Sequence, residues 1–227
     1  MMIKIKAASK GFAKKQVLRN FSYTFESGKA YALLGANGAG KSTLIKSIMK
    51  LIFLDEGDIS QHVSCAYLPE QPYLPESMTP EQLIAFACAQ KGIEKRQVYH
   101  LLEEVRLKPS SWNQRISKCS KGMKQRIAIA YVLAGNPEWF ILDEPMSGLD
   151  VMGRSLVLDI FKKRHQQGAG IIMCSHSVED ITKLCEHVLF LVDGELKESR
   201  PIREKSLQEA RDLEERLKYW HDDKAFD

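Results

Sequence analysis

The stretch GANGAGKST, residues 35–43, decides the fold. It follows an apolar run that ends at Leu34, and apolar residues spaced three or four apart begin after Ser42. Glycines allow backbone N–H groups to crowd around phosphate oxygens, and a helix N-terminus adds its positive end. A G-x-x-x-x-G-K-[ST] pattern between a strand and a helix therefore predicts a loop that binds the phosphates of a nucleotide.

Each residue of this loop has an expected task. We expect Lys41 to reach the outer phosphates and the Ser42 hydroxyl to coordinate Mg²⁺. A simple glycine turn is a poor alternative, because with about 7% glycine the pattern arises by accident in on the order of one chain in a hundred this long. The other expected nucleotide-binding residues of the loop are Gly35, Asn37, Gly38, Ala39, Gly40 and Thr43.

A second motif, WFILDEP at residues 139–145, is an apolar strand that ends in two adjacent carboxylates. The carboxyl ends of parallel strands are where ligands bind in doubly wound sheets. We expect Asp143 to hold Mg²⁺ or its water shell, and Glu144 to orient or deprotonate the attacking water. Acids also follow strands simply because loops are solvated, but two acids directly after four apolar residues favour the functional interpretation.

Strands that alternate with helices around both motifs predict an α/β fold with a mostly parallel sheet, as in P-loop NTPases. Short β-like runs at the start of the chain predict an amino-terminal antiparallel β subdomain. Residues from about 75 to 134 interrupt the alternation and predict an inserted helical subdomain. We divide the chain into a domain of residues 1–199 and a charged helical tail of residues 200–227. The sequence DEGD, residues 55–58, predicts a turn.

The tail has one apolar stripe along its predicted helix, consisting of Leu207, Ala210, Leu213 and Leu217. Asp212 and Arg216 are spaced as an i,i+4 ion pair. We expect the stripe to pack on the tail's own domain, and a docking surface for a partner is the less favoured alternative.

Composition restricts the class of protein. The net charge is +4, but residues 1–50 hold ten Lys or Arg against the single acid Glu26. Such a region suits phosphate, nucleic acid or anionic lipid, although Lys4 and Lys6 alternate with isoleucines as on the solvent face of a strand.

The longest apolar runs fall far short of the roughly 20 residues that cross a bilayer. Five cysteines without C-x-x-C spacing indicate free thiols. We expect a cytoplasmic protein.

Taken together, the motifs resemble the ATP-binding subunit of an ABC transporter, over residues 3 to 199. The family's signature, usually LSGGQ, corresponds here to CSKGM at 119–123, and the downstream SGLD at 147–150 and Ser175-His176 follow in the family's order. The resemblance implies an ATPase that uses ATP and Mg²⁺. It also implies a head-to-tail dimer, of two copies or with a paralogue, in which each signature closes over the partner's nucleotide.

The resemblance assigns further roles residue by residue. Ser120, Lys121 and Gly122 would contact the ATP of the partner subunit, with Lys121 in place of the usual glycine. His176 would contact the γ-phosphate and sense its loss, and Asp150 would link the two nucleotide sites across the dimer.

Two positions remain open at this stage. Phe12 falls where the family places an aromatic residue that stacks on adenine, with Val17 as a further cofactor-binding residue, but Phe12 is equally compatible with a core position. An aromatic ring that stacks on a base contacts only its π-face and does not distinguish adenine from guanine, so GTP should also be accepted. Glu70 and the adjacent Gln71 compete for the place of the family's lid glutamine. Both are candidate metal ligands, since a carboxylate also ligates Mg²⁺.

The leading functional hypothesis is a dimer that powers transport through a separate transmembrane permease, with the chain peripheral at the inner face of the cell membrane. The sequence SKGMKQR and the apolar tail stripe favour an exporter. The substrate belongs to the permease and is not encoded here. The alternative is a soluble ABC-type ATPase that switches a protein or nucleic-acid assembly. Nucleic acid is not expected, because the basic region lacks interleaved aromatic residues. A catalytically inactive domain conflicts with the intact catalytic and phosphate-binding residues.

Overall fold

The structure is a computed structural model that describes residues 2–13 and 15–222. The parts of the predicted domain and tail that fall on residues 1, 14 and 223–227 lie outside the described residues.

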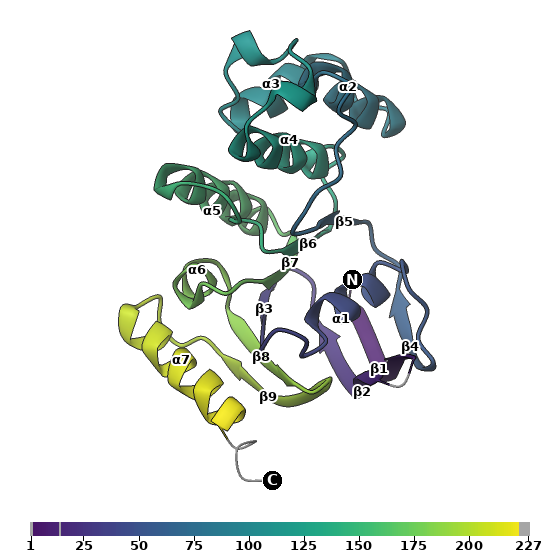
Figure 1. The fold of residues 1–227 in the computed structure, drawn as a ribbon, viewed down its shortest axis with the longest axis vertical. Helices are drawn as coiled ribbons and strands as arrows, with labels where there is room; N and C mark the ends of the chain where they lie inside the picture. The colour runs from purple at the N-terminus through teal and green to yellow at the C-terminus, as the bar shows by residue number, and fades with distance from the viewer. Residues whose placement is uncertain (1, 14, 223–227) are drawn as a thin grey trace.

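A six-stranded sheet forms the centre of the molecule, with strand order β5-β6-β7-β3-β8-β9 (Figure 1). Its neighbours are parallel except for the antiparallel β8–β9 pair. Every residue of β3, β6 and β7 is buried, as expected for parallel strands covered on both faces. The strands are β3 Ala30–Leu34, β5 Cys65–Leu68, β6 Trp139–Asp143, β7 Gly170–Cys174, β8 His187–Val192 and β9 Glu195–Pro201.

A separate antiparallel sheet has β1 (Ile3–Phe12) between β2 (Lys15–Phe25) and β4 (Glu56–Gln61). Lys4 and Lys6 are exposed and their isoleucine neighbours are buried, which confirms the solvent-face interpretation. The turn predicted at residues 55–58 is wrong. β4 begins at Glu56, and Asp58 pairs with Lys6 of β1, so cross-strand pairing overrides the local turn preference.

Helices cover the six-stranded sheet. Between the strands run α1 (Lys41–Ile48), α5 (Val151–Gln166) and α6 (Val178–Leu184). A lobe of helices projects from the sheet (Figure 1) and consists of α2 (Pro80–Gln90), α3 (Arg96–Glu104) and α4 (Lys121–Leu133), with 3-10 turns at Pro109–Ser111 and Ile116–Lys118. The lobe shares one continuous hydrophobic cluster with the sheet and α5. The shared cluster marks no boundary at residue 199, so the division into a domain of residues 1–199 and a tail of residues 200–227 stays a prediction.

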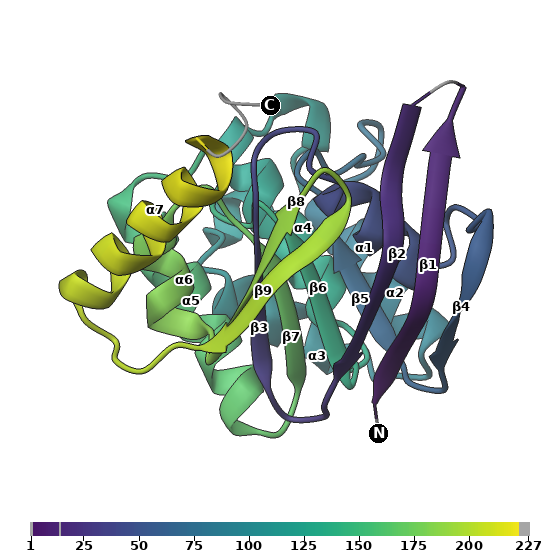
Figure 2. The same ribbon diagram turned by 90° about the horizontal axis from the view of Figure 1, so that it is seen from below.

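The last element, α7 (Leu207–Asp222), lies beside α6 and β9 (Figure 2). Ala210 and Leu213 are buried in the main hydrophobic cluster, so most of the predicted stripe packs on its own domain. Leu207 is an exception, because it is 68% exposed. Asp212 and Arg216 each bond to a residue of β9. The predicted pair persists as an electrostatic interaction, because the charge of Asp212 adds to the rise in the pKa of Arg216 that the hydrogen bond with Glu198 causes.

Two sequence expectations concern compartment. Among the helices that the structure describes, none is both long and apolar enough to span a membrane. All five cysteines are free, and four of them are buried.

Candidate nucleotide site

The parallel register brings four strand ends to one edge of the sheet. Leu68 of β5 pairs with Leu142 of β6, and Asp143 pairs with Cys174 of β7. Cys174 lies in turn beside Leu33 of β3. The segments that leave these strands are the phosphate loop after β3, Glu70 after β5, Glu144 after β6 and His176 after β7. Segments far apart in the sequence therefore meet at this edge.

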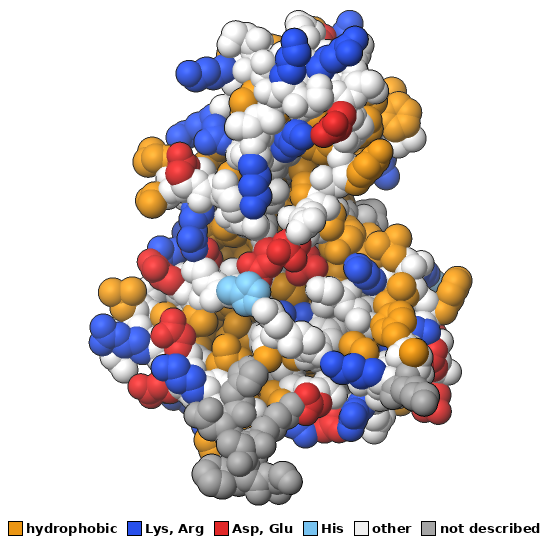
Figure 3. Space-filling view, in the orientation of Figure 1, with side chains coloured by type: hydrophobic (Ala, Val, Ile, Leu, Met, Phe, Trp, Pro, Cys, Tyr) orange, Lys and Arg blue, Asp and Glu red, His pale blue; other side chains and the backbone are white. Residues whose placement is uncertain are grey.

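These segments form an open cavity of about 160 Å³. Figure 3 shows acidic side chains gathered beside a histidine between the helical lobe and the rest of the molecule. Every lining residue is one that the sequence proposed as a site residue. The lining consists of Val17, Asn37, Gly38, Gly40, Lys41, Ser42, Thr43, Glu70, Asp143, Glu144 and His176.

The phosphate loop presents the N-terminus of α1 to this cavity. Its N-cap is Gly40, at φ 104°, with no side chain to occupy the N–H groups of the first turn. A Cβ at Gly40 would lie 2.6 Å from the carbonyl oxygen of Val17, so only glycine fits. Lys41 Nζ donates to the carbonyl oxygens of Gly35 (2.6 Å) and Ala36 (3.0 Å), which holds the ammonium over the loop. This arrangement suits a polyphosphate.

Asp143 and Ser42 are the oxygen donors that fit Mg²⁺. Asp143 is 7% exposed, and burial raises the pKa of its carboxyl group while a hydrogen bond with Ser42 opposes the rise. A carboxylate and a hydroxyl within hydrogen-bond distance of each other are the hard ligands that Mg²⁺ takes beside nucleotide phosphates. Neither side chain donates a nitrogen or sulfur ligand, so the pair fits this ion.

Glu144 is held in an unusual conformation beside His176. Its φ is 50°, in the left-handed region that non-glycine residues rarely occupy, and its N–H donates to the carbonyl of Cys174 at 3.0 Å. Burial raises the pKa of its carboxyl group, and the nearby His176 opposes the rise. His176 Nε2 lies 3.5 Å from Glu144 Oε1, a buried oxygen without a hydrogen-bond partner among the described residues. A carboxylate oxygen that makes no hydrogen bond among the described residues and borders a cavity can accept a proton from water.

The open positions divide as follows. Glu70 lines the cavity and Gln71 does not. Phe12 is 48% exposed, which excludes a core position, and Lys10 Nζ lies 5.5 Å from its ring centroid. Phe12 lies outside the cavity lining, so its contact with adenine stays a prediction. Gly35 and Ala39 also lie outside the lining.

The signature residues lie away from this cavity, at the N-terminus of α4. The Ser120 hydroxyl accepts a hydrogen bond from Met123 N–H at 3.2 Å and caps the helix. The side chain of Lys121 runs over Gly148 of the SGLD segment, and Gly122 faces Gly148 as well. Asp150 caps α5 by accepting from Gly153 N–H at 2.7 Å. The structure thus brings Ser120, Lys121 and Gly122 next to the SGLD segment, and none of them lines the chain's own cavity.

The fold and the site define a P-loop nucleotide-binding protein with an inserted helical lobe. The profile of the ABC transporter family matches residues 18–147, more than half of the chain. The chain therefore belongs to this family, and it is an ATPase of the ABC cassette type.

Individual proteins similar to this chain are also ATP-binding proteins of the ABC type. The SkfA peptide export ATP-binding protein SkfE of Bacillus subtilis (strain 168) is 30% identical over 86% of this chain and 87% of its own length. A solved ATP-binding subunit of an ABC transporter is 29% identical, with a TM-score of 0.84 over 94% of this chain and 99% of that chain. A dimeric, post-hydrolysis ATP-binding cassette with ADP and Pi is 20% identical, with a TM-score of 0.81 over 88% of this chain and 99% of that chain, and supports the fold.

The burial of Asp143 gives a prediction about stability. Because its pKa is raised above the ordinary 3.8, the folded state holds the proton more tightly than the unfolded chain, and ionisation above about pH 4 destabilises the fold. Asp143→Asn should therefore raise the melting temperature of the nucleotide-free protein at pH 7, by about 2–4 °C for each kcal/mol. The difference should shrink as the pH falls towards 4, and Mg²⁺-dependent hydrolysis should be lost.

Thermal unfolding by circular dichroism at the two pH values measures this effect. Asp58→Asn, at an exposed position, is the matched control and should leave the melting temperature unchanged. A lower melting temperature for Asp143→Asn than for the wild type at pH 7 would show that ionised Asp143 stabilises the fold.

Proposed function

We propose that two copies of this chain, or this chain and a paralogue, pair head to tail and enclose two ATP molecules with Mg²⁺ between them. The position of the signature carries this proposal. Ser120 and Gly122 lie at a helix N-terminus, which attracts anions, yet they do not line their own nucleotide cavity. A phosphate that they contact must then be held by another subunit. Exposed Val151 and Met152 beside Asp150 supply apolar surface for the same contact.

Energetics favour a shared nucleotide as the cause of closure. Moving a two-state equilibrium from mostly open to mostly closed needs about 5.5 kcal/mol of differential affinity. One hydrogen bond to a charged group contributes about 1.5–3 kcal/mol. Several such bonds from both subunits to each of two ATP molecules suffice, whereas one bond from one subunit does not. Hydrolysis and phosphate release would remove these bonds and reopen the dimer.

Within each site we assign the chemistry to the residues of the cavity. Lys41 and the loop N–H groups hold the phosphates, and Ser42 and Asp143 hold Mg²⁺, which neutralises phosphate charge. Glu144 accepts the proton of the attacking water, and His176, whose Nε2 lies 3.5 Å from Glu144 Oε1, orients that carboxylate and contacts the γ-phosphate. Glu70 is favoured over Gln71 as the lid residue, because it lines the cavity.

Glu144→Gln tests the catalytic assignment. The amide keeps the size of the side chain but cannot act as a base, so ATP should still bind while turnover falls by about 10²-fold or more. The ATP-bound dimer should then persist and elute as a dimer in gel filtration with MgATP, and as a monomer without nucleotide. A variant that is monomeric with MgATP and turns over normally would contradict the role of Glu144.

We further propose that the dimer drives transport through a separate transmembrane permease. An apolar groove of about 500 Å³ lies where the segment after Glu70 meets the helical lobe, and Figure 3 shows hydrophobic side chains gathered at this junction. Tyr73 is 93% exposed and Phe86 51% exposed at the groove. The groove is lined by Tyr73, Leu74, Pro75, Met78, Leu83, Phe86 and Tyr131.

The occupant that fits this groove is an amphipathic helix from the cytoplasmic side of a permease. The lid residue Glu70 begins the segment that forms one wall, so a helix in the groove would move with the nucleotide site. Export is the direction we propose, supported by the relative named as a peptide export ATP-binding protein. The chain would then sit at the inner face of the membrane.

Phe86→Glu tests the groove. A charge placed among apolar side chains should abolish co-purification of the tagged chain with an integral membrane protein, when the genes that flank its own are co-expressed. Hydrolysis by the isolated chain should stay within about twofold of the wild type, because Phe86 lies outside the nucleotide cavity. Leu207→Glu, at an exposed apolar position on α7, is the control and should keep the partner.

A wild-type chain that stays free of any integral membrane protein in this experiment would refute the permease. The soluble ATPase switch would then be the better hypothesis.

A further inference from the structure

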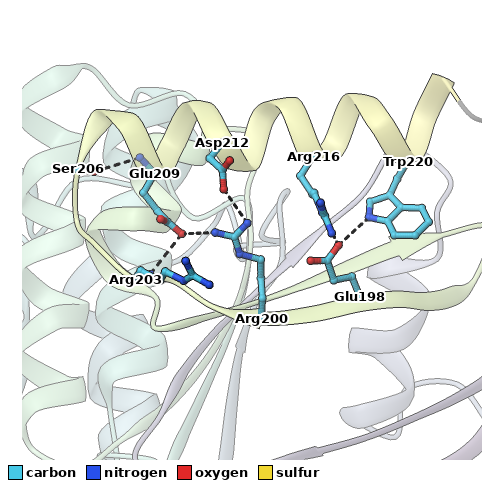
Figure 4. A network of polar contacts seen from close by, with 8 residues as sticks. All are labelled: Glu198, Arg200, Arg203, Ser206, Glu209, Asp212, Arg216 and Trp220. Carbon is cyan, nitrogen blue, oxygen red and sulfur yellow. Dashed lines mark hydrogen bonds and ion pairs between the residues drawn. The ribbon is translucent and has the colours of Figure 1, made fainter.

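The C-terminal helix α7 is fastened to strand β9 by charged side chains (Figure 4). At one end of the helix, Arg200 of β9 donates to Glu209 Oε1 at 2.9 Å and to Asp212 Oδ2 at 2.8 Å. Glu209 is 8% exposed, and the N–H of Arg203 also donates to it, at 3.4 Å. Arg200 is therefore the cation that compensates a buried carboxylate of α7.

A second contact holds the other end of the helix. Glu198 of β9 accepts from Arg216 Nε at 2.7 Å and from Trp220 Nε1 at 3.2 Å. Between the two ends, Ala210 and Leu213 are buried in the main hydrophobic cluster. Charged contacts with β9 therefore hold both ends of α7, while the apolar face between them packs in the main hydrophobic cluster beside α6 and β8.

Strand β9 in turn begins at a turn that is bonded to the phosphate loop. The N–H of Gly194 donates to the carbonyl oxygen of Ala39 in that loop at 3.0 Å, and Gly194 accepts from the N–H of Arg19 on β2 at 2.9 Å. Gly194 has φ 80°, and a Cβ there would collide with the carbonyl oxygen of Val17. The turn thus fits closely between the phosphate loop and β2.

The helix also faces the phosphate loop across a cavity. Leu217 of α7 lines a second cavity of about 260 Å³, together with residues 36–39 of the loop. Asn37 and Gly38 line both this cavity and the nucleotide cavity. The second cavity is completed by Lys15, Gln16, Arg19, Leu191, Val192 and Asp193.

From these contacts we propose that α7 positions the phosphate loop for nucleotide, with Arg200 as the positioning residue. Arg200 holds α7 on β9, β9 holds its turn against Ala39, and Leu217 bounds the loop from the second cavity. Docking of α7 and binding of ATP then stabilise each other, because coupling between two sites is reciprocal. The inference rests on the nucleotide position proposed above.

Loss of Arg200 would act on binding more than on chemistry. Without it, Glu209 would be a buried charge that has lost its cation, and the adjacent end of α7 would separate from β9 to hydrate it. The turn would then support the loop less well, so fewer molecules would hold the loop in the shape that binds phosphates. Glu144 and His176 are on other strand ends and would be unaffected.

Steady-state hydrolysis of MgATP by the full chain tests the proposal. Arg200→Gln should raise the KM for ATP by about fivefold or more and leave kcat within about twofold, and Arg200→Lys should restore part of the affinity. Arg211→Gln, an exposed position on the same helix, is the matched control with an unchanged KM. A purely structural role would instead lower the melting temperature with KM unchanged.

Hydrogen exchange supplies a second measurement. In the wild type, adding ADP should slow exchange of the α7 amides as well as those of the phosphate loop, and in Arg200→Gln the α7 amides should exchange fast. Should Arg200→Gln fail to fold, Arg216→Gln at the more exposed end should raise KM in the same direction, and Glu198→Arg/Arg216→Glu should reverse that rise.

The outcomes separate the two proposals. Normal nucleotide binding by the wild type, with KM unchanged in these variants despite fast exchange in α7, would overturn the role of α7 alone. A wild type in which ADP protects neither segment would overturn the proposed nucleotide position together with this inference.

Discussion

The parallel register of β3, β5, β6 and β7 is the constraint on which the rest of the structure depends. Parallel strands end at the same edge of a sheet, so a single register fixes where the phosphate loop, Glu70, Glu144 and His176 lie relative to one another. A slip of one residue would turn each side chain to the other face. The completely buried strands prevent such a slip, since their apolar side chains would have to leave the core.

The residues of the site that this register forms destabilise the folded, nucleotide-free protein. Burial raises the pKa of both Asp143 and Glu144, so their ionised forms destabilise the nucleotide-free protein. Glu144 also occupies a left-handed conformation, and one of its buried oxygens has no hydrogen-bond partner within residues 2–13 and 15–222. Such features persist where the surrounding structure determines them, and they are typical of functional sites. Mg²⁺ and a polyphosphate would relieve part of this cost by supplying the charge and the donors that the residues face.

Most of the phosphate cavity was predictable because its residues belong to short motifs that carry their own geometry. All the lining residues, from Val17 to His176, were proposed from the sequence. The sequence could not predict that Glu70, and not Gln71, lines the cavity, because adjacent residues in a loop have no periodicity that assigns one of them to it. Prediction failed at DEGD, which became part of β4 through pairing with β1. Nor did the sequence indicate Glu198 of β9, a distant residue that accepts a hydrogen bond from Arg216. The contact of Gly194 with the phosphate loop joins residues far apart in the sequence, and no motif of the sequence indicates it.

The central claim is that the signature of one subunit closes on the phosphate loop of another, and cysteine cross-linking tests it most directly. Asn37→Cys would be placed in one tagged subunit and Ser120→Cys in a second, both with Glu144→Gln, and treated with a short bis-maleimide, which adds one thiol to each of its two double bonds. The account predicts a cross-link between the two subunits that needs MgATP, and none within a chain that carries both cysteines when it is kept monomeric without nucleotide. A cross-link within one such chain, or no link between subunits in MgATP, would contradict it.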